Sequence, residues 1–182
     1  MDLIEFNNFK KTLQKTAKKV LADKGGHEPI FLCVSDDDLL MMGLFFQNDS
    51  AKTISSMMMK DVAEFKKAKA VFIISEVWAV VSDTENLNGV SPGNHPDKKE
   101  LITINSQHVS GENHYAAAVM TRDKNNVLTV GEFSDGYIET KGRFDNIFNN
   151  EFPTRTPEIV LPPLIKIGQS IDCCKEYSPY YL

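Results

Sequence analysis

The sequence predicts an α+β domain in which an antiparallel sheet of about six strands carries two helices, both packed on one of its faces. Two observations support this fold class. Two segments near the amino terminus have apolar residues at helical spacing, and from Ala70 onward apolar residues recur with a period of two. Because the helices and most of the strands occupy separate parts of the chain, we expect the order helix, two strands, helix and then four strands.

The first helix is predicted over residues 4–24. Its apolar residues recur every three or four positions, and most of its lysines fall on the opposite side. Gly25 and Gly26 end this helix, because glycine readily adopts the left-handed conformation that caps helices. The next stretch, PIFLCVSDDDLLMMGLFF, predicts two apolar strands joined by an acidic turn at residues 35–38.

The second helix is predicted from Asp49 or Ser50, either of which can cap it, to about Lys69. The residues that we expect to form its buried stripe are Ile54, Met58, Val62 and Phe65. The run Met57-Met58-Met59 is interpreted as adaptable core filling, because methionine fits irregular gaps.

Residues 70–81 are predicted to form a strand that is covered on both sides, because both of its faces are apolar. The turn signals SGEN and DKNN separate three further expected strands, at about residues 100–109, 114–122 and 127–133. If SGEN is a four-residue hairpin loop, Ile104 is paired with Val119.

The chain is expected to hold one domain of about residues 1–150, because 182 residues bury a sizeable core without disulfides or metals. Residues 151–182 are predicted to be a Pro-rich, extended C-terminal appendage, since they show no sustained periodicity. Their apolar stretches VLPPLIKI and YSPYYL are poorly placed in water unless they dock on this domain or on a neighbouring molecule.

The composition argues against several classes of function. The formal net charge of −5 disfavours a nucleic-acid binder, because such proteins need a positive field. No segment has the ~18 apolar residues of a membrane helix, and the start MDLIEFNNFKK is not typical of a secretory signal. Cys33, Cys173 and Cys174 cannot form a disulfide framework, so we expect a reducing, cytoplasmic location.

The carboxylate of Glu76 raises the main functional question. The stretch FIISEVWAVV places it in a strand with two apolar faces, where an ionised carboxylate needs a partner. The predicted partners are the side chains of His95, Lys98, Lys99 or Arg122, or the hydroxyls and amides of neighbouring strands.

A long loop, residues 82–97, follows this strand and ends in HPDKKE, which brings together His95, Asp97 and Glu100. With Glu76 they form a candidate acid/base or metal constellation. In the alternative interpretation they are ordinary turn residues, and Glu76 is bonded to backbone amides.

We expect the loop to fold partly over the sheet and to make a shallow pocket floored by Glu76 and Trp78. His95 and Lys98 are the other binding residues predicted for it. No metal and no cofactor are predicted, because the sequence lacks HExxH, paired CxxC, GxGxxG and P-loop patterns.

The strand FIISEVWAVV and the segment HPDKKELITINSQ resemble a family of small, uncharacterised bacterial and phage-encoded proteins. That family has a Ser-Glu-aromatic strand followed by a His-Pro-Asp-basic-x-Glu segment. The matching residues here are Ser75, Glu76, Trp78, His95, Pro96, Asp97, Lys98 and Glu100. The resemblance covers about the middle half of the chain and implies no activity.

The sequence favours a small cytoplasmic binding or assembly module without catalytic activity. Its protein partner is unknown, and the expected mode of association is a homo-oligomer formed through the C-terminal tail or the sheet face. The alternative is a hydrolase with acid/base or metal-assisted chemistry at Glu76, His95 and Asp97. Whether the protein is an enzyme therefore stays open at this stage.

Overall fold

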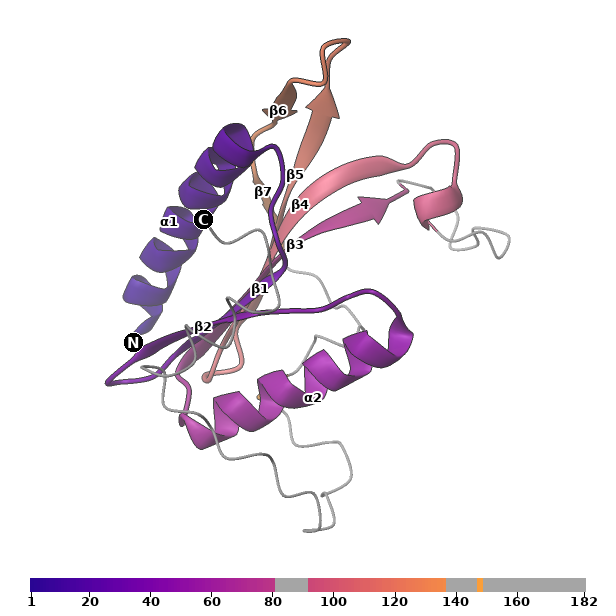
Figure 1. Cartoon of the computed structure of the whole chain (residues 1–182). Coiled ribbons are helices and arrows are strands. Elements are labelled where there is room, and N and C mark those ends of the chain that lie inside the picture. Colours follow the sequence, from indigo (N-terminus) through magenta and orange to yellow (C-terminus); the bar gives the residue numbers. More distant parts are fainter. Residues whose placement is uncertain (81–91, 137–146, 149–182) are drawn as a thin grey trace. The chain divides into compact units, whose positions relative to one another are not determined.

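The computed structural model describes residues 1–80, 92–136 and 147–148 (Figure 1). They form two α-helices, a short 3₁₀ helix and a seven-stranded antiparallel sheet, which confirms the predicted α+β class. In chain order the elements are α1 (Leu3–Lys24), β1 (Ile30–Val34), β2 (Leu39–Gly43), α2 (Asp49–Phe65), β3 (Ala70–Ala79), η1 (Pro92–Asn94), β4 (Lys99–His108), β5 (Asn113–Arg122), β6 (Leu128–Val130) and β7 (Ser134–Gly136). The predicted appendage, Val81 of the predicted strand and residues 82–91 of the long loop lie outside the described residues.

The strands follow the order β2-β1-β3-β4-β5-β6, and β7 pairs with β5. The strand expected at residues 127–133 is in fact shorter, and β7 follows it as an additional strand. β6 pairs with the end of β5, where Met120 lies opposite Val130, and β7 pairs with its first half, where Tyr115 lies opposite Gly136. One edge of the sheet is therefore formed by two three-residue strands, and the other edge is formed by β2.

The helix α1 has well-defined ends, of which the sequence predicts the one at Gly25. The carboxylate of Asp2 accepts hydrogen bonds from the backbone amides of Ile4 and Glu5, both at 2.8 Å, and the Glu5 carboxylate accepts one from the Asp2 amide at 2.9 Å. This reciprocal arrangement is a capping box. At the other end Gly25 caps the helix with φ 71°, a left-handed conformation that glycine adopts without strain.

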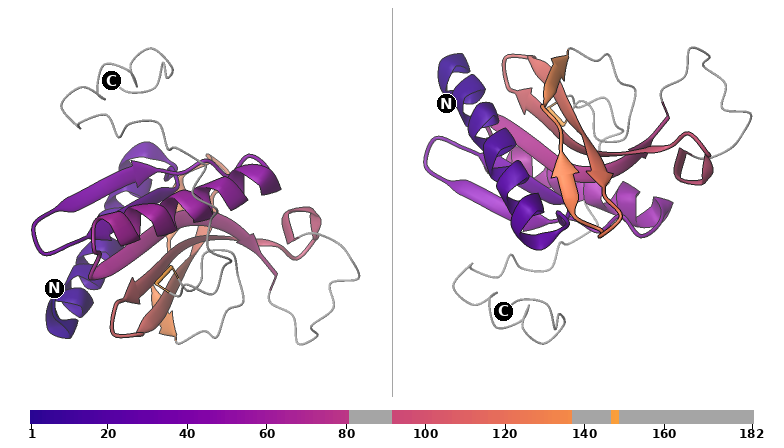
Figure 2. Two further views of the ribbon diagram at one scale, coloured as in Figure 1. Left: turned by 90° about the horizontal axis from the view of Figure 1, so that it is seen from below. Right: turned by 90° about the horizontal axis from the view of Figure 1, so that it is seen from above.

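The prediction that both helices pack on one face is wrong. The α1 face of β3 carries Phe72 and Ile74, which join the core beneath α1, whereas Val71 and Ile73 join a separate core beneath α2. Figure 2 shows α2 nearer the viewer from below and α1 nearer the viewer from above. The physical reason is the alternation of β3, because a strand with two apolar faces needs a cover on each.

The helix α2 also differs from its prediction at both ends. The side chain of Asn48 caps it by accepting from the Ala51 amide at 2.8 Å, one residue before the predicted cap. It ends at Phe65, earlier than expected, because Lys67 takes a left-handed φ of 50°. The Ala68 amide then donates to the Ala63 carbonyl at 2.9 Å, which closes a Schellman turn.

The side of α2 that faces the sheet is not the predicted stripe. Its buried residues are Ser55, Ser56, Met59 and Ala63. Of the predicted stripe, Ile54 and Phe65 are 58% and 69% exposed, and Met58 is exposed as well. Small Ser and Ala side chains allow the helix to approach the sheet closely, and of the methionine run only Met59 serves as core.

The hairpin between β4 and β5 has a different register from the predicted one. Ile104 lies opposite Ala116 rather than Val119. The amide of His108 donates to the Glu112 carbonyl at 2.8 Å, and Gly111 between them has φ 95°. A three-residue loop with a positive-φ glycine therefore replaces the expected four-residue loop, and the odd shift exchanges the two faces of β5.

Candidate functional site

Glu76 is partly buried on β3, and its partner is a backbone amide. The carboxylate oxygen Oε1 accepts a hydrogen bond at 2.5 Å from the amide of His27, in the connection between α1 and β1. Gly26 lies beside the same oxygen, which is 3.6 Å from the position that a Cβ would take there. Among the described residues, none of the four predicted charged partners is bonded to Glu76.

A second carboxylate, Glu100, lies on the same face of the sheet, because it is directly opposite Trp78, two residues beyond Glu76. Its Oε2 atom lies 3.6 Å from Nε of Arg122 on β5. The Nη2 atom of Arg122 in turn donates to the carbonyl of Gly25 at 3.0 Å. Glu76 and Arg122 thus both hold the backbone of the α1–β1 connection, because Glu76 accepts from the His27 amide and Arg122 donates to the Gly25 carbonyl.

The residues around η1 form contacts of their own. The Nδ1 atom of His95 accepts from the Asp97 amide at 3.1 Å and lies 3.9 Å from the Asp97 Oδ2 atom. The ammonium of Lys98 lies 4.6 Å from the centroid of the Trp78 ring and donates to the Gly93 carbonyl at 2.6 Å. Trp78 and Lys98, both predicted as binding residues, are therefore in contact through a cation–π interaction.

Of the four residues of the predicted constellation, only His95 and Asp97 lie together in the described part of the chain, whereas the partners of Glu76 and Glu100 lie outside the constellation. His95 meets Asp97, Lys98 meets Trp78 and Glu100 meets Arg122, whereas Glu76 is bonded to the α1–β1 connection. Within residues 1–80, 92–136 and 147–148, no three His, Cys, Asp or Glu side chains are grouped so that they could hold a metal ion. The expected shallow pocket over Glu76 depends on residues 81–91 and stays a prediction.

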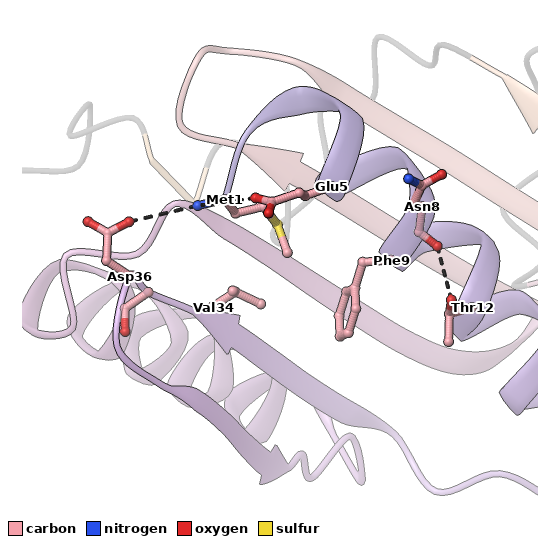
Figure 3. A pocket seen from close by; sticks show the side chains of 8 residues that line it. Met1, Glu5, Asn8, Phe9, Thr12, Val34 and Asp36 are labelled. Atoms are coloured by element: carbon pink, nitrogen blue, oxygen red, sulfur yellow. Dashed lines mark hydrogen bonds and ion pairs between the residues drawn. The ribbon is translucent and has the colours of Figure 1, made fainter.

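A pocket of about 580 Å³ lies elsewhere, between the first half of α1 and the end of β1. Figure 3 shows Phe9 and Val34 at its centre and the carboxylates of Glu5 and Asp36 near the Met1 amino group. Phe9 is partly buried, and its ring lies 5.1 Å from that of Phe72. The sequence places Phe9 on the apolar side of α1, but nothing in the pattern indicates that space remains beside it.

The outer side of α2 is the largest departure from the sequence prediction. Four large apolar residues are exposed there and form what we call the α2 stripe: Ile54, Met57, Met58 and Phe65. Steps of four and seven residues place Ile54, Met58 and Phe65 on one side of the helix. The phenyl ring of Phe45, just before α2, is also exposed.

Comparison with known proteins identifies the family. A family model described as bacteriophage lambda protein ea47 matches residues 4–147, which reaches well beyond the middle half covered by the resemblance. Nothing matches among curated proteins or among solved structures. None of the described helices is long and apolar enough to cross a membrane. Because the matched range spans more than half of the 182 residues, the chain belongs to the family of bacteriophage lambda protein ea47.

Proposed function

We propose that the protein is a self-associating assembly module without catalytic activity. The observation that supports this proposal is the α2 stripe. A helix on the surface of a globular protein normally exposes charged and polar side chains. Here Ile54 and Phe65 keep more than half of their surface in water, and large apolar side chains exposed on one side of a helix are expected at an interaction site.

The free energy available at the stripe is large enough to support association. A phenylalanine buries roughly 200 Å² when it is covered completely. Covering the exposed 69% of Phe65 therefore removes roughly 140 Å² from water, which at ~25 cal/mol per Å² stabilises a complex by about 3 kcal/mol. The other three stripe residues add to this, and ordering the interface opposes it.

The arrangement of the stripe suits a second copy of α2 in antiparallel orientation. Ile54 lies in the first half of the helix and Phe65 is its last residue, with the two methionines between them. In an antiparallel pair, Ile54 of one chain packs against Phe65 of the second copy, and the reverse contact repeats by symmetry. Methionine side chains adapt to such an interface because they are unbranched and flexible.

Light scattering after size-exclusion chromatography tests the proposal on the full chain. The double substitution Ile54→Glu and Phe65→Glu should lower the mass at a given concentration, because it places charges within the stripe. The matched control is Val119→Glu with Val127→Glu, since both valines are exposed on the β5–β6 side of the molecule. Equal masses for the wild type, the stripe variant and the control would show that the α2 stripe does not mediate self-association.

A hydrolase remains the second candidate, supported by the contact between His95 and Asp97 at the end of the long loop. In this hypothesis His95 and Asp97 orient water, and Glu76 acts as the acid or base. A screen of phosphoesterase and esterase substrates should then show turnover by the wild type that Glu76→Gln abolishes. The assembly module predicts no turnover by either protein.

A further inference from the structure

In the described part of the chain, β2 forms one edge of the sheet, and its own residues give that edge none of the usual protection. Residues Leu39–Gly43 read LLMMG, with no charged residue and no proline. The opposite edge consists of β6 and β7, three residues each, with Glu132 between them and Asp135 within β7. Proteins normally protect sheet edges with charges, prolines or very short strands, because a bare edge pairs with other strands.

The backbone of β2 alternates between the two sides of the strand. The amide of Leu44 donates to the Pro29 carbonyl at 2.8 Å, which marks a hydrogen-bonded pair just beyond the strand. Bonded and non-bonded pairs alternate in an antiparallel ladder, so Leu40 and Met42 bond to β1. The residues whose N–H and C=O groups point to the outer side are therefore Leu39, Met41 and Gly43.

These outward-bonding residues also present a complementary surface on the α1 face. Leu39 and Met41 are 51% and 67% exposed. Gly43 is on the same face, and a Cβ built on it would meet nothing within 4 Å. The strand thus carries a large apolar side chain near one end and open space near the other.

We propose that the outer edge of β2 pairs in antiparallel fashion with β2 of a second copy, about a two-fold axis at Met41. This pairing places Met41 opposite its own equivalent and Leu39 beside Gly43 of the second copy, where the leucine occupies the space that glycine leaves. Three bonded pairs supply about six backbone hydrogen bonds. The inference rests on the proposed function only in that the chain self-associates, and it names an interface separate from the α2 stripe.

Charge favours a second copy over a basic peptide. The turn before β2 contains Asp36 and Asp38, but Asp36 lies 3.3 Å from the Lys69 ammonium and Asp38 lies 2.8 Å from that of Lys66. These acidic groups are compensated within the chain and offer little attraction to a cationic strand.

Charge also selects the antiparallel orientation. The two-fold axis places the acidic turns of the two copies at opposite ends of the shared ladder. Five residues at ~3.4 Å each separate them by roughly 17 Å, beyond the Debye length of ~8 Å at physiological salt. A parallel pair would place the two turns side by side, where the exposed carboxylates of Asp37, which have no ion-pair partner among the described residues, would repel each other.

Disulfide trapping tests the pairing on the full chain. A bonded antiparallel pair has Cα atoms ~5.5 Å apart, which suits a disulfide. In a background with Cys173→Ser and Cys174→Ser, Met41→Cys should become a covalent dimer on mild oxidation. Thr129→Cys, exposed on the opposite edge strand, is the matched control and should stay largely monomeric. Equal yields for the two variants would overturn the proposal.

Sedimentation velocity separates this inference from the proposed function. Met41→Lys places like charges directly opposite each other and should weaken the β2 contact about ten-fold or more, while Val127→Lys on the other side should not. Circular dichroism checks that both variants fold. If the wild type associates, Met41→Lys is unchanged and no disulfide forms, the β2 interface is wrong and the α2 stripe stands. If Met41→Lys becomes monomeric and the stripe variant keeps the wild-type mass, the α2 stripe is wrong and the β2 interface stands.

Discussion

Removing the Glu76 carboxylate should destabilise the protein in a way that depends on which residue replaces it. The amide of His27 donates to Oε1 of Glu76, and this is the hydrogen bond that Glu76→Ala removes. Leaving a buried donor without an acceptor costs ~1–3 kcal/mol. Because Glu76 is only partly buried, water can accept a hydrogen bond from the His27 amide in the variant, which reduces the loss of stability. We therefore expect about 1–1.5 kcal/mol for Glu76→Ala.

The substitution Glu76→Gln keeps an oxygen acceptor at the same reach and should cost less than about 0.5 kcal/mol. Urea unfolding measures both changes, and Trp78, the single tryptophan of the chain, reports on the same end of β3. Glu64→Ala is the control, since Glu64 is exposed on α2. If Glu76→Ala proves as neutral as this control, the carboxylate does not hold the α1–β1 connection.

Three further outcomes follow from the structure. The hydrogen bond from Lys66 holds the pKa of the Asp38 carboxyl below its usual value of 3.8. The contribution of the Asp38–Lys66 pair to stability is therefore present above about pH 4 and is lost as the pH falls through the lowered pKa of Asp38. An NMR titration should show that midpoint rising in Lys66→Met, and an unchanged midpoint would contradict the assignment. Burial raises the pKa of the Cys33 thiol to about 11. In a background without the other two cysteines, a thiol reagent at neutral pH should therefore react far more slowly with the folded protein than with the urea-unfolded protein. Equal rates would show that the thiol is accessible. Gly111→Ala forces a Cβ onto a residue with φ 95° and should lower the free energy of unfolding by about 1–2 kcal/mol, whereas no loss would mean that the hairpin loop can take another form.

The sequence predicts those parts of the fold that depend on local pattern. The first helix ends at Lys24 with Gly25 as its cap, as predicted, and the long strands follow the period-two alternation of their apolar residues. The position of α2 could not be predicted in the same way. Apolar residues occur on both of its sides, so hydrophobicity favoured the large Ile54 and Phe65, whereas close packing buries the small Ser55 and Ala63. Which helix covers which face of β3 is likewise a long-range outcome.

The candidate site was predictable only in part. The need for a partner at Glu76 follows from its apolar strand, but the partner, the amide of His27, lies 49 residues away in sequence and leaves no local signal. The contact between Trp78 and Lys98 joins two of the four predicted binding residues, but the contact itself was not predicted. By contrast, the α2 stripe and the bare edge of β2 become visible only when burial and strand order are known.

The central claim is that this member of the ea47 family is an assembly module, and sedimentation velocity of the wild-type full chain over a wide concentration range tests it most directly. The account predicts a mass above the 20.4 kDa of one chain that rises with concentration, and a return to 20.4 kDa when Met41→Lys is combined with Ile54→Glu and Phe65→Glu. A wild-type mass of 20.4 kDa at every concentration up to several hundred micromolar would contradict it.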